Sequence, residues 1–268
     1  MLIYKHLVKT DSTNAYLQRQ QSEADIRNWV VSADGQTAGK GMGSNGWESE
    51  AGKNLTFSLA LDASFLPAAR QFLLSEAVAL GIIDVLDKLL SNSLEGMSFQ
   101  AEAVRLESMP SKPTDKLHIK WPNDIYFGNR KLAGILINST IKADKMDTSI
   151  IGIGLNVNQM KFQDWPTHPI SLRQITGQTY DLQPLLEQIA ESIYNKVEIL
   201  KTDPTAIERE YLERLFRYRT WADYEVGKET LRLFMTGIDP FGRLQLIDEE
   251  NNAYCFDIKE IRFILPSS

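Results

Sequence analysis

The chain has 268 residues, of which 43% are hydrophobic and 24% charged, a composition typical of a globular protein with a sizeable buried core. Its formal net charge is −6, and lysine and arginine are spread along the chain, so binding to duplex DNA is not expected. No apolar stretch is long enough to span a bilayer, and the first residues lack the apolar run of a signal peptide. Cys255 is the only cysteine, which excludes an internal disulfide and favours a cytoplasmic location; alternation around it predicts a core thiol.

Three strands and one short helix are predicted in the first part of the chain. The strands lie at residues 3–8, 29–32 and 55–61. Apolar and polar residues alternate strictly through the third strand, which predicts that only one of its faces is buried. Asp11 or Ser12 is placed to cap a helix that ends near residue 20, and the glycine-rich residues 34–52 connect the second strand to the third.

A long helix and a segment without periodicity follow. Pro67 starts a helix whose apolar residues keep helical spacing to about Leu90. Residues 91–116 follow neither the helical nor the strand period and contain Pro110 and Pro113. We therefore expect a long surface insertion there.

A hairpin with several polar residues comes next, and it is the most informative part of the sequence. Apolar residues at 125, 127, 132, 135 and 137 predict strands on either side of a turn at Gly128 and Asn129. Pro122 cannot donate to a ladder, so we expect it at a strand start or a sheet edge, with the two residues after it free to contact a ligand. Gly134 interrupts an otherwise branched strand, which indicates a close approach to its backbone.

The second half of the chain predicts helices followed by short strands. Residues 148–157 read as a strand, and three helices then start at Ser171, Asp181 and Asp203, the last ending near Arg217. From residue 223 onward only short strands are predicted, at residues 230–237, 243–247, 254–258 and 260–265. They predict a small β-barrel-like unit that buries little surface by itself, so we expect it to pack against the larger part.

The loop at residues 36–47 has enough glycine for backbone amides to surround an anionic ligand. The Gly-Lys-Ser/Thr ending of a Walker loop is absent and no helical pattern follows, so P-loop geometry is excluded. Read alone, the loop fits a flexible connector equally well. The histidines at positions 6, 118 and 168 have no metal-ligand spacing, so no metal site is predicted.

Five segments, in chain order, resemble those of the biotin protein ligases. They are residues 11–14 (DSTN), 36–47, 120–124 (KWPND), 131–135 (KLAGI) and 152–158 (GIGLNVN). The resemblance implies an α+β fold in which a mixed β-sheet backed by helices, the class II synthetase-like catalytic domain of biotin and lipoate ligases, precedes a small SH3-like β-barrel. It implies a catalytic domain at residues 1–220 and an SH3-like domain at residues 221–268. Because no helix-turn-helix precedes Ser12, it implies the monofunctional form without a repressor role.

The reaction implied by the resemblance has two steps. Biotin and MgATP give biotinyl-5′-adenylate and pyrophosphate, and a lysine of a biotin carboxyl carrier protein or domain then takes the biotinyl group as an amide. The implied substrates are ATP and biotin, with Mg²⁺ held largely by phosphates because the sequence shows no carboxylate cage. No DNA or membrane partner is implied, and the chain is expected to be a monomer or homodimer.

Residue types at the matching positions suit this chemistry. Lys131 and Lys40 offset the repulsion between a carboxylate and a phosphate, and Asp124 orients or deprotonates the carrier lysine, so these three are the implied catalytic residues. The implied biotin-binding residues are Ser12, Thr13, Asn14, Gln36, Gly39, Lys40, Lys131, Gly134, Gly152 and Gly154. The implied nucleotide-binding residues are Gly41, Met42, Trp47, Lys120, Asn123 and Asn156.

The glycine loop departs from the family pattern at two positions, because members usually carry arginine in place of Met42 and glycine in place of Ser44. Methionine offers neither a charge nor a donor, so we expect weaker retention of the adenylate. Two other functions stay open, a lipoate protein ligase and a non-catalytic sensor of biotin or its adenylate. The terminal β-unit is alternatively a module that mainly docks a protein.

Overall fold

The structure, a computed structural model, describes residues 1–43, 46–98, 116–163 and 168–265. A mixed seven-stranded sheet forms its centre, with strand order β1-β2-β3-β7-β6-β5-β4. The strands are β1 (Ile3–Thr10), β2 (Trp29–Gln36), β3 (Leu55–Asp62), β4 (Leu117–Lys120), β5 (Asp124–Phe127), β6 (Arg130–Lys142) and β7 (Lys145–Leu155). β1 and β2 run parallel and the other neighbouring pairs antiparallel. The predicted hairpin is confirmed as β5 and β6, whose turn contains Gly128 with a φ of 56°.

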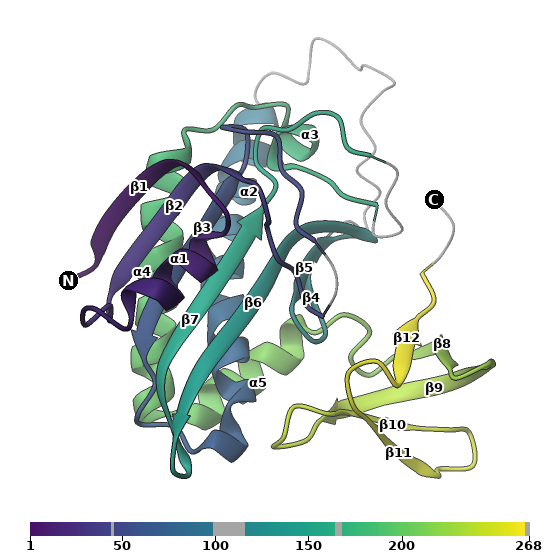
Figure 1. Ribbon diagram of the computed structural model, residues 1–268. Coiled ribbons are helices and arrows are strands. Elements are labelled where there is room, and N and C mark those ends of the chain that lie inside the picture. Colours follow the sequence, from purple (N-terminus) through teal and green to yellow (C-terminus); the bar gives the residue numbers. More distant parts are fainter. Residues whose placement is uncertain (44–45, 99–115, 164–167, 266–268) are drawn as a thin grey trace.

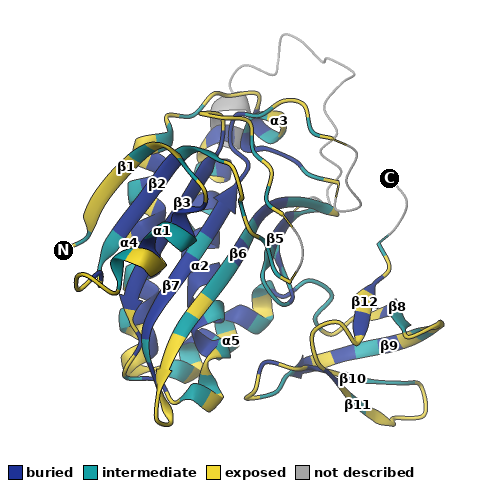
Figure 2. Cartoon of the chain, in the orientation of Figure 1, coloured by how far each residue is buried: buried dark blue, intermediate teal, exposed yellow. Residues whose placement is uncertain are grey.

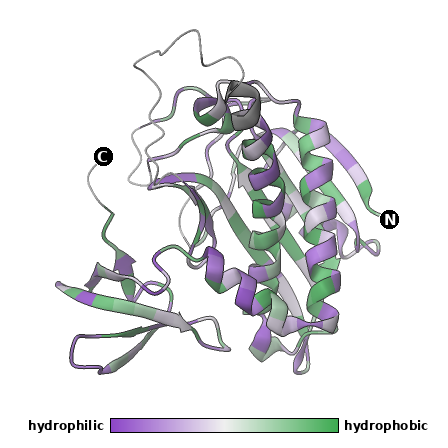
Figure 3. Cartoon of the chain, turned by 180° about the vertical axis from the view of Figure 1, so that it is seen from behind, coloured by the Kyte–Doolittle hydropathy of each residue, from purple (hydrophilic) through white to green (hydrophobic). Residues whose placement is uncertain are grey.

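Helices cover both faces of this sheet (Figure 1). On one face, α1 (Thr13–Gln20) packs against β2, β3 and β7, and on the other lie α2 (Phe72–Ser98), α4 (Leu182–Thr202) and α5 (Pro204–Arg214). Figure 3 shows the helices of this second face from the outside, with hydrophilic and hydrophobic residues alternating along them. An apolar stripe runs along α4, where Leu185, Leu186, Ile189, Ile193, Val197 and Leu200 are all buried and Leu182 is half-buried. Burial is deepest in β2, β3 and β7 (Figure 2).

The helix starts predicted for the second half are confirmed by their caps. Ser171 and Gln174 form a capping box at the start of α3 (Leu172–Thr176), which ends at Gly177 with a φ of 73°. The carboxylate of Asp181 accepts a hydrogen bond from Gln183 N at 3.3 Å at the start of α4. Asp203 accepts one from Ala206 N at 3.0 Å at the start of α5.

A second, five-stranded antiparallel sheet follows the helices, with strand order β11-β10-β9-β8-β12. Its strands are β8 (Trp221–Val226), β9 (Glu229–Ile238), β10 (Leu244–Ile247), β11 (Ala253–Phe256) and β12 (Ile261–Phe263). β8 was not predicted; in it, polar Asp223 and Glu225 alternate with Ala222 and Tyr224, which are buried. The expected packing against the larger part is confirmed, since one continuous core includes both sheets and Trp121 Nε1 donates to Gly242 O at 2.9 Å.

Three predicted helix boundaries are wrong. After the 3₁₀ turn η1 (Ala68–Arg70), α2 begins at Phe72 and continues to Ser98, so the first residues of the expected insertion are helical. Residues 99–115, the rest of that insertion, lie outside the described residues. α5 ends at Arg214 rather than near Arg217, because Phe216 N donates to Ile119 O at 2.8 Å and the chain runs on beside β4.

Three local predictions are also corrected or narrowed. β3 is buried on both faces rather than one, because helices cover each side of the sheet. Pro122 lies in the turn that leaves the edge strand β4, after a cis peptide bond, so of the two expected positions it takes the sheet edge and not the strand start. Cys255 is exposed rather than in the core, because Tyr254 and Phe256 face the core and Cys255 lies on the other face of β11. In the described part of the chain no helix is long and apolar enough to cross a membrane.

Candidate active site

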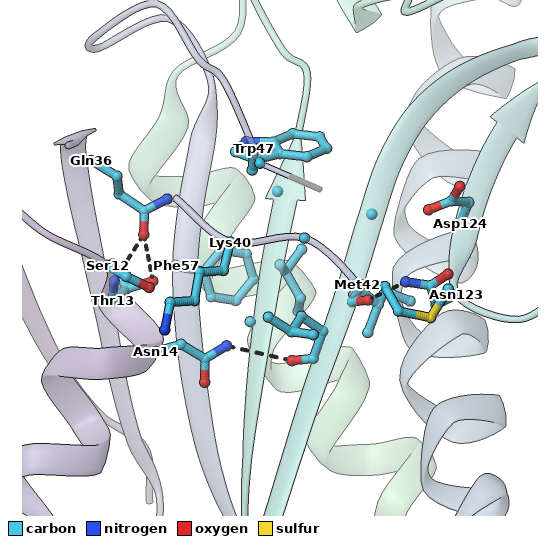
Figure 4. A pocket seen from close by; sticks show the side chains of 18 of the residues that line it. Ser12, Thr13, Asn14, Gln36, Lys40, Met42, Trp47, Phe57, Asn123 and Asp124 are labelled. Atoms are coloured by element: carbon cyan, nitrogen blue, oxygen red, sulfur yellow. Dashed lines mark hydrogen bonds between the residues drawn. The ribbon is translucent and has the colours of Figure 1, made fainter. Parts of the chain in front are cut away.

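A cavity lies on the face of the central sheet that carries α1, beneath the glycine-rich loop (Figure 4). Most of the predicted site residues line it, although they come from segments far apart in the sequence. They are Ser12, Thr13, Asn14, Gln36, Lys40, Gly41, Met42, Trp47, Asn123, Asp124, Lys131, Gly134, Gly152 and Gly154. The fold therefore gathers hydrogen-bonding side chains, two lysines and one carboxylate around a single space.

The polar end of the cavity is built where β1 leads into α1. Gln36 Oε1, at the end of β2, accepts hydrogen bonds from Thr13 N at 2.8 Å and from Thr13 Oγ1 at 3.3 Å. The Thr13 hydroxyl also lies 2.8 Å from the Ser58 hydroxyl on β3. These bonds join α1 to two strands and fix the Thr13 side chain.

Asn14 extends this polar end over β6 and β7. Its Nδ2 donates to Leu136 O at 3.4 Å, and its Oδ1 is buried without a hydrogen-bond partner among the described residues. A buried acceptor without a partner costs free energy, and a ligand N–H directed at it would remove that cost. Figure 4 also shows the Lys40 side chain extending from the loop toward Asn14.

The charged end of the cavity is an ion pair between neighbouring strands. Lys131 Nζ on β6 lies 2.7 Å from Asp124 Oδ1 on β5, and the two side chains are only 21% and 15% exposed. A register shift between Ile125 and Tyr126 interrupts the β5–β6 ladder between these residues. Asn123 and Asp124 line the cavity as expected, but both side chains already have protein partners, since Asn123 Nδ2 donates to Ile135 O at 2.7 Å and Asp124 pairs with Lys131.

Trp47 lies across the sheet between the two ends (Figure 4). A Cβ atom on Gly154 would lie 2.2 Å from the indole, so only glycine admits the ring there. The close approach predicted at Gly134 is confirmed, since a Cβ there would lie 3.3 Å from both Lys131 and Trp47. The Lys131 ammonium is 5.8 Å from the centre of a Trp47 ring, within the range of a cation–π interaction.

Three predicted site residues do not line the cavity. Gly39 lies in the loop, where its carbonyl accepts from Trp47 N at 3.0 Å. Asn156 is buried below Lys131, and its Nδ2 donates to Ile170 O at 3.1 Å and to Lys131 O at 3.4 Å. Lys120 faces the second sheet, and burial lowers the pKa of its ammonium. Ser44, the second departure from the family pattern, lies outside the described residues.

Apolar residues of the central sheet that were not predicted as site residues also line the cavity. They are Phe57, Ile135, Leu136 and Ile153, together with Gly46 of the loop. Phe57, Ile135 and Ile153 pair with one another across the sheet and belong to the core on its other face, whereas Leu136 pairs with Gly152 and faces the cavity. Periodicity predicts such strands but not which of their faces borders a cavity. Among the described lining residues Asp124 is the sole carboxylate, and the described chain contains no cluster of three or more His, Cys, Asp or Glu arranged for a metal.

Comparison with known families and curated proteins gives a consistent result. The model of the Biotin/lipoate A/B protein ligase family matches residues 7–156, more than half of the chain. The bifunctional ligase/repressor BirA of Bacillus spizizenii is 30% identical over 193 residues, which are 70% of this chain and 51% of that protein. The biotin–[acetyl-CoA-carboxylase] ligase of Paracoccus denitrificans is 28% identical over 247 residues, 90% of this chain and 92% of the relative. The chain thus spans about half the length of the first relative and nearly all of the second.

A solved structure shares the whole fold. The biotin protein ligase from Aquifex aeolicus in complex with biotin and ATP superposes with a TM-score of 0.72, covering 97% of this chain and 99% of that one. The sequences are 21% identical, so the likeness establishes the fold. The mixed sheet with helices and the second antiparallel sheet both fall within the matched region.

Proposed function

Because this chain belongs to the biotin/lipoate A/B protein ligase family, we propose that it is a biotin protein ligase. It forms biotinyl-5′-adenylate from biotin and ATP and transfers the biotinyl group to a lysine of a biotin carboxyl carrier protein or domain. The observation that carries the proposal is the cavity itself, which places a network of neutral hydrogen-bonding groups opposite a lysine–carboxylate pair. The ureido ring of biotin requires neutral hydrogen-bonding groups, and formation of an acyl adenylate requires a positive charge near the reacting anions.

The polar end orients biotin. Asn14 offers an amide oxygen without a partner, an acceptor suited to an N–H of a ureido ring, and the Thr13 hydroxyl, whose proton goes to Gln36, keeps a lone pair for a second N–H. The glycine backbone below Trp47, at Gly134 and Gly154, and the Leu136 side chain leave an apolar surface that suits the thiophane ring and alkyl chain. Biotin then lies with its carboxylate toward Lys131.

The first step brings two anions together. A biotin carboxylate oxygen attacks the α-phosphorus of ATP, the new P–O bond forms the adenylate, and pyrophosphate leaves. Lys131 lowers the energy of this approach by binding both anions, and Lys40 of the loop contributes a second positive charge. Until an anion binds, Asp124 neutralises Lys131 at 2.7 Å, so the ligand shares Lys131 with Asp124.

The nucleotide is held under the glycine loop. Trp47 stacks on the adenine, and Asn123 and the amide of Gly41 bind the ribose and phosphates. Mg²⁺ arrives with ATP and offsets phosphate charge; the single carboxylate of the cavity fits a metal held by phosphates better than a protein cage. Met42 supplies no positive charge to the intermediate, so the adenylate escapes faster than from an arginine-bearing loop.

The second step transfers the acyl group. The carrier lysine loses a proton, its amine attacks the acyl carbon, an amide bond forms and AMP leaves. Asp124 is the carboxylate placed to accept the proton or orient the amine. It regains its pairing with Lys131 when AMP departs.

We also propose that residues 1–220 form the catalytic domain and residues 221–268 an SH3-like domain, in a cytoplasmic protein. The single cysteine supports that location. The carrier domain is the expected protein partner.

Biotin-dependent exchange of labelled pyrophosphate into ATP tests the proposal, with lipoate as the matched alternative acid. We expect exchange with biotin and none with lipoate. Exchange with lipoate alone would indicate a lipoate ligase. Tight binding of biotin without exchange would indicate a sensor, and either result would contradict the proposal.

A further inference from the structure

The two sheets meet at a cluster of aromatic rings that encloses one lysine. Lys120 is the last residue of β4, and its Nζ lies 5.3 Å from the centre of the Tyr126 ring on β5. On the other side, the Phe263 ring of β12 has its centre 5.0 Å from the same nitrogen. The Lys120 ammonium is thus held between one ring of the central sheet and one ring of the second sheet.

Phe263 is itself held firmly. It is 7% exposed, its backbone pairs with Tyr224 of β8, and the two rings meet edge to face at 5.2 Å. Arg217, in the segment that joins the sheets, donates to Ile264 O at 2.6 Å and places its guanidinium 6.0 Å from the Phe263 ring. The ring therefore has little freedom to leave Lys120.

Lys120 is also close to the charged end of the cavity. The β4–β5 register places it directly opposite Asp124, whose carboxylate pairs with Lys131. Burial and the neighbouring cations Lys131 and Arg217 lower the pKa of Lys120, whereas Asp124 favours its charged form. The electron-rich faces of the two rings replace part of the water that a buried ammonium loses.

We propose that Phe263 is a positioning residue for the nucleotide step. It holds Lys120 beside Asp124, so that this carboxylate is shared between two lysines and Lys131 keeps more of its capacity to bind an anion. The second sheet then contributes to the electrostatics of the site, although none of its described residues lines the cavity. This inference rests on the proposed ligase function.

The test compares two substitutions of one ring with a matched control. Phe263→Leu keeps an apolar side chain but removes the ring face, Phe263→Tyr keeps the ring, and Phe256→Leu removes another buried ring of the same sheet that contacts Tyr254 instead. We expect Phe263→Leu to raise the KM for MgATP in pyrophosphate exchange about five- to tenfold, which lies between the values for an exposed and a desolvated cation–π contact. The KM for biotin of Phe263→Leu should stay within about twofold of the wild-type value. In Phe263→Tyr and Phe256→Leu, the KM values for MgATP and for biotin should both stay within that range.

A second readout does not depend on activity. Lysines are reductively dimethylated with ¹³C-formaldehyde, and the methyl resonance of Lys120 is assigned from the Lys120→Arg variant. We expect a ring-current shift upfield in the wild type that is largely lost in Phe263→Leu and kept in Phe263→Tyr and Phe256→Leu.

An unshifted Lys120 resonance, or a KM for MgATP in Phe263→Leu equal to that in Phe256→Leu, would overturn the inference. If the Lys120 resonance is shifted but the wild type shows no biotin-dependent exchange, the contact between Lys120 and Phe263 is supported. The ligase proposal is then rejected, and with it the role of Phe263 in the nucleotide step.

Discussion

At the polar end of the cavity, Thr13, Gln36 and Ser58 form a hydrogen-bonded network that is complete before any ligand arrives. At the charged end, Lys131 and Asp124 form an ion pair, and an anion that binds Lys131 must share the lysine with Asp124. The first end is rigid because neutral groups satisfy one another across α1, β2 and β3. The second end can change partners during a reaction. Orientation and chemistry are thus assigned to different ends of one cavity.

Removing the lysine of the charged end should have the largest effect. Lys131→Ala is expected to slow adenylate formation about 10²- to 10³-fold, because it removes the cation that faces both reacting anions. Lys142→Ala, which changes an exposed lysine on the same strand, is the control and should stay near wild type. The rate of biotin-dependent pyrophosphate release measures both, and equal rates would show that the charged end does not carry the chemistry.

Asp124→Asn should separate the two steps. Transfer from the preformed adenylate to the carrier lysine is expected to fall about 10²-fold, as for loss of a general base. Adenylate formation should change much less, since Lys131 loses a competitor for its charge. Single-turnover kinetics of each step give the comparison, and Asp147→Asn, which breaks a surface ion pair with Lys142, is the control. Equal losses in both steps would contradict a role specific to transfer.

Met42→Arg should strengthen the hold of the loop on the intermediate. A hydrogen bond to a charged group is typically about 1.5–3 kcal/mol, so dissociation of biotinyl-5′-adenylate should slow roughly ten- to a hundredfold. Met160→Arg adds the same charge at an exposed site and should leave the rate unchanged. The dissociation rate is read by chase with unlabelled ligand. Equal dissociation rates for the wild type and Met42→Arg would contradict this prediction.

Thr13→Val should have the smallest effect and act on binding alone. Loss of the hydroxyl between Ser58 and Gln36 is expected to raise the KM for biotin about five- to tenfold, as for one neutral buried hydrogen bond. The kcat should stay within about twofold, because no charge changes. Thr37→Val, at an exposed position near the same loop, is the control. If kcat fell by the same factor as KM rose, Thr13 would affect catalysis as well as binding, and the separation of binding at the polar end from chemistry at the charged end would be contradicted.

Local sequence signals were enough for most of the elements, whereas the polar residues that line the cavity were implied by the resemblance to the biotin protein ligases. Capping residues such as Ser171 and Asp181 act within one turn of helix, so the sequence alone locates those helix starts. The pairing of Lys131 with Asp124 was not predictable, because it lies across a strand pair whose register shifts between the two residues. Nor was the contact between Lys120 and Phe263, which joins strands far apart in the chain.

The predictions of which strand residues lie in the core were incomplete for a related reason. Leu136 alternates with its neighbours as a core residue does, and only the arrangement of α1 and the loop leaves space above it. Cys255 has the pattern of a core residue, yet it lies on the uncovered face of β11. Both outcomes depend on which elements cover a strand, which periodicity does not encode.

Transfer of biotin to a carrier lysine can be observed by intact-mass measurement of a biotin carboxyl carrier domain incubated with this protein, biotin and MgATP. We expect one biotinyl amide on one carrier lysine with the wild type, none with Lys131→Ala over the same time, and none when lipoate replaces biotin. An unmodified carrier after incubation with a folded wild-type protein that binds biotin would contradict the proposed function.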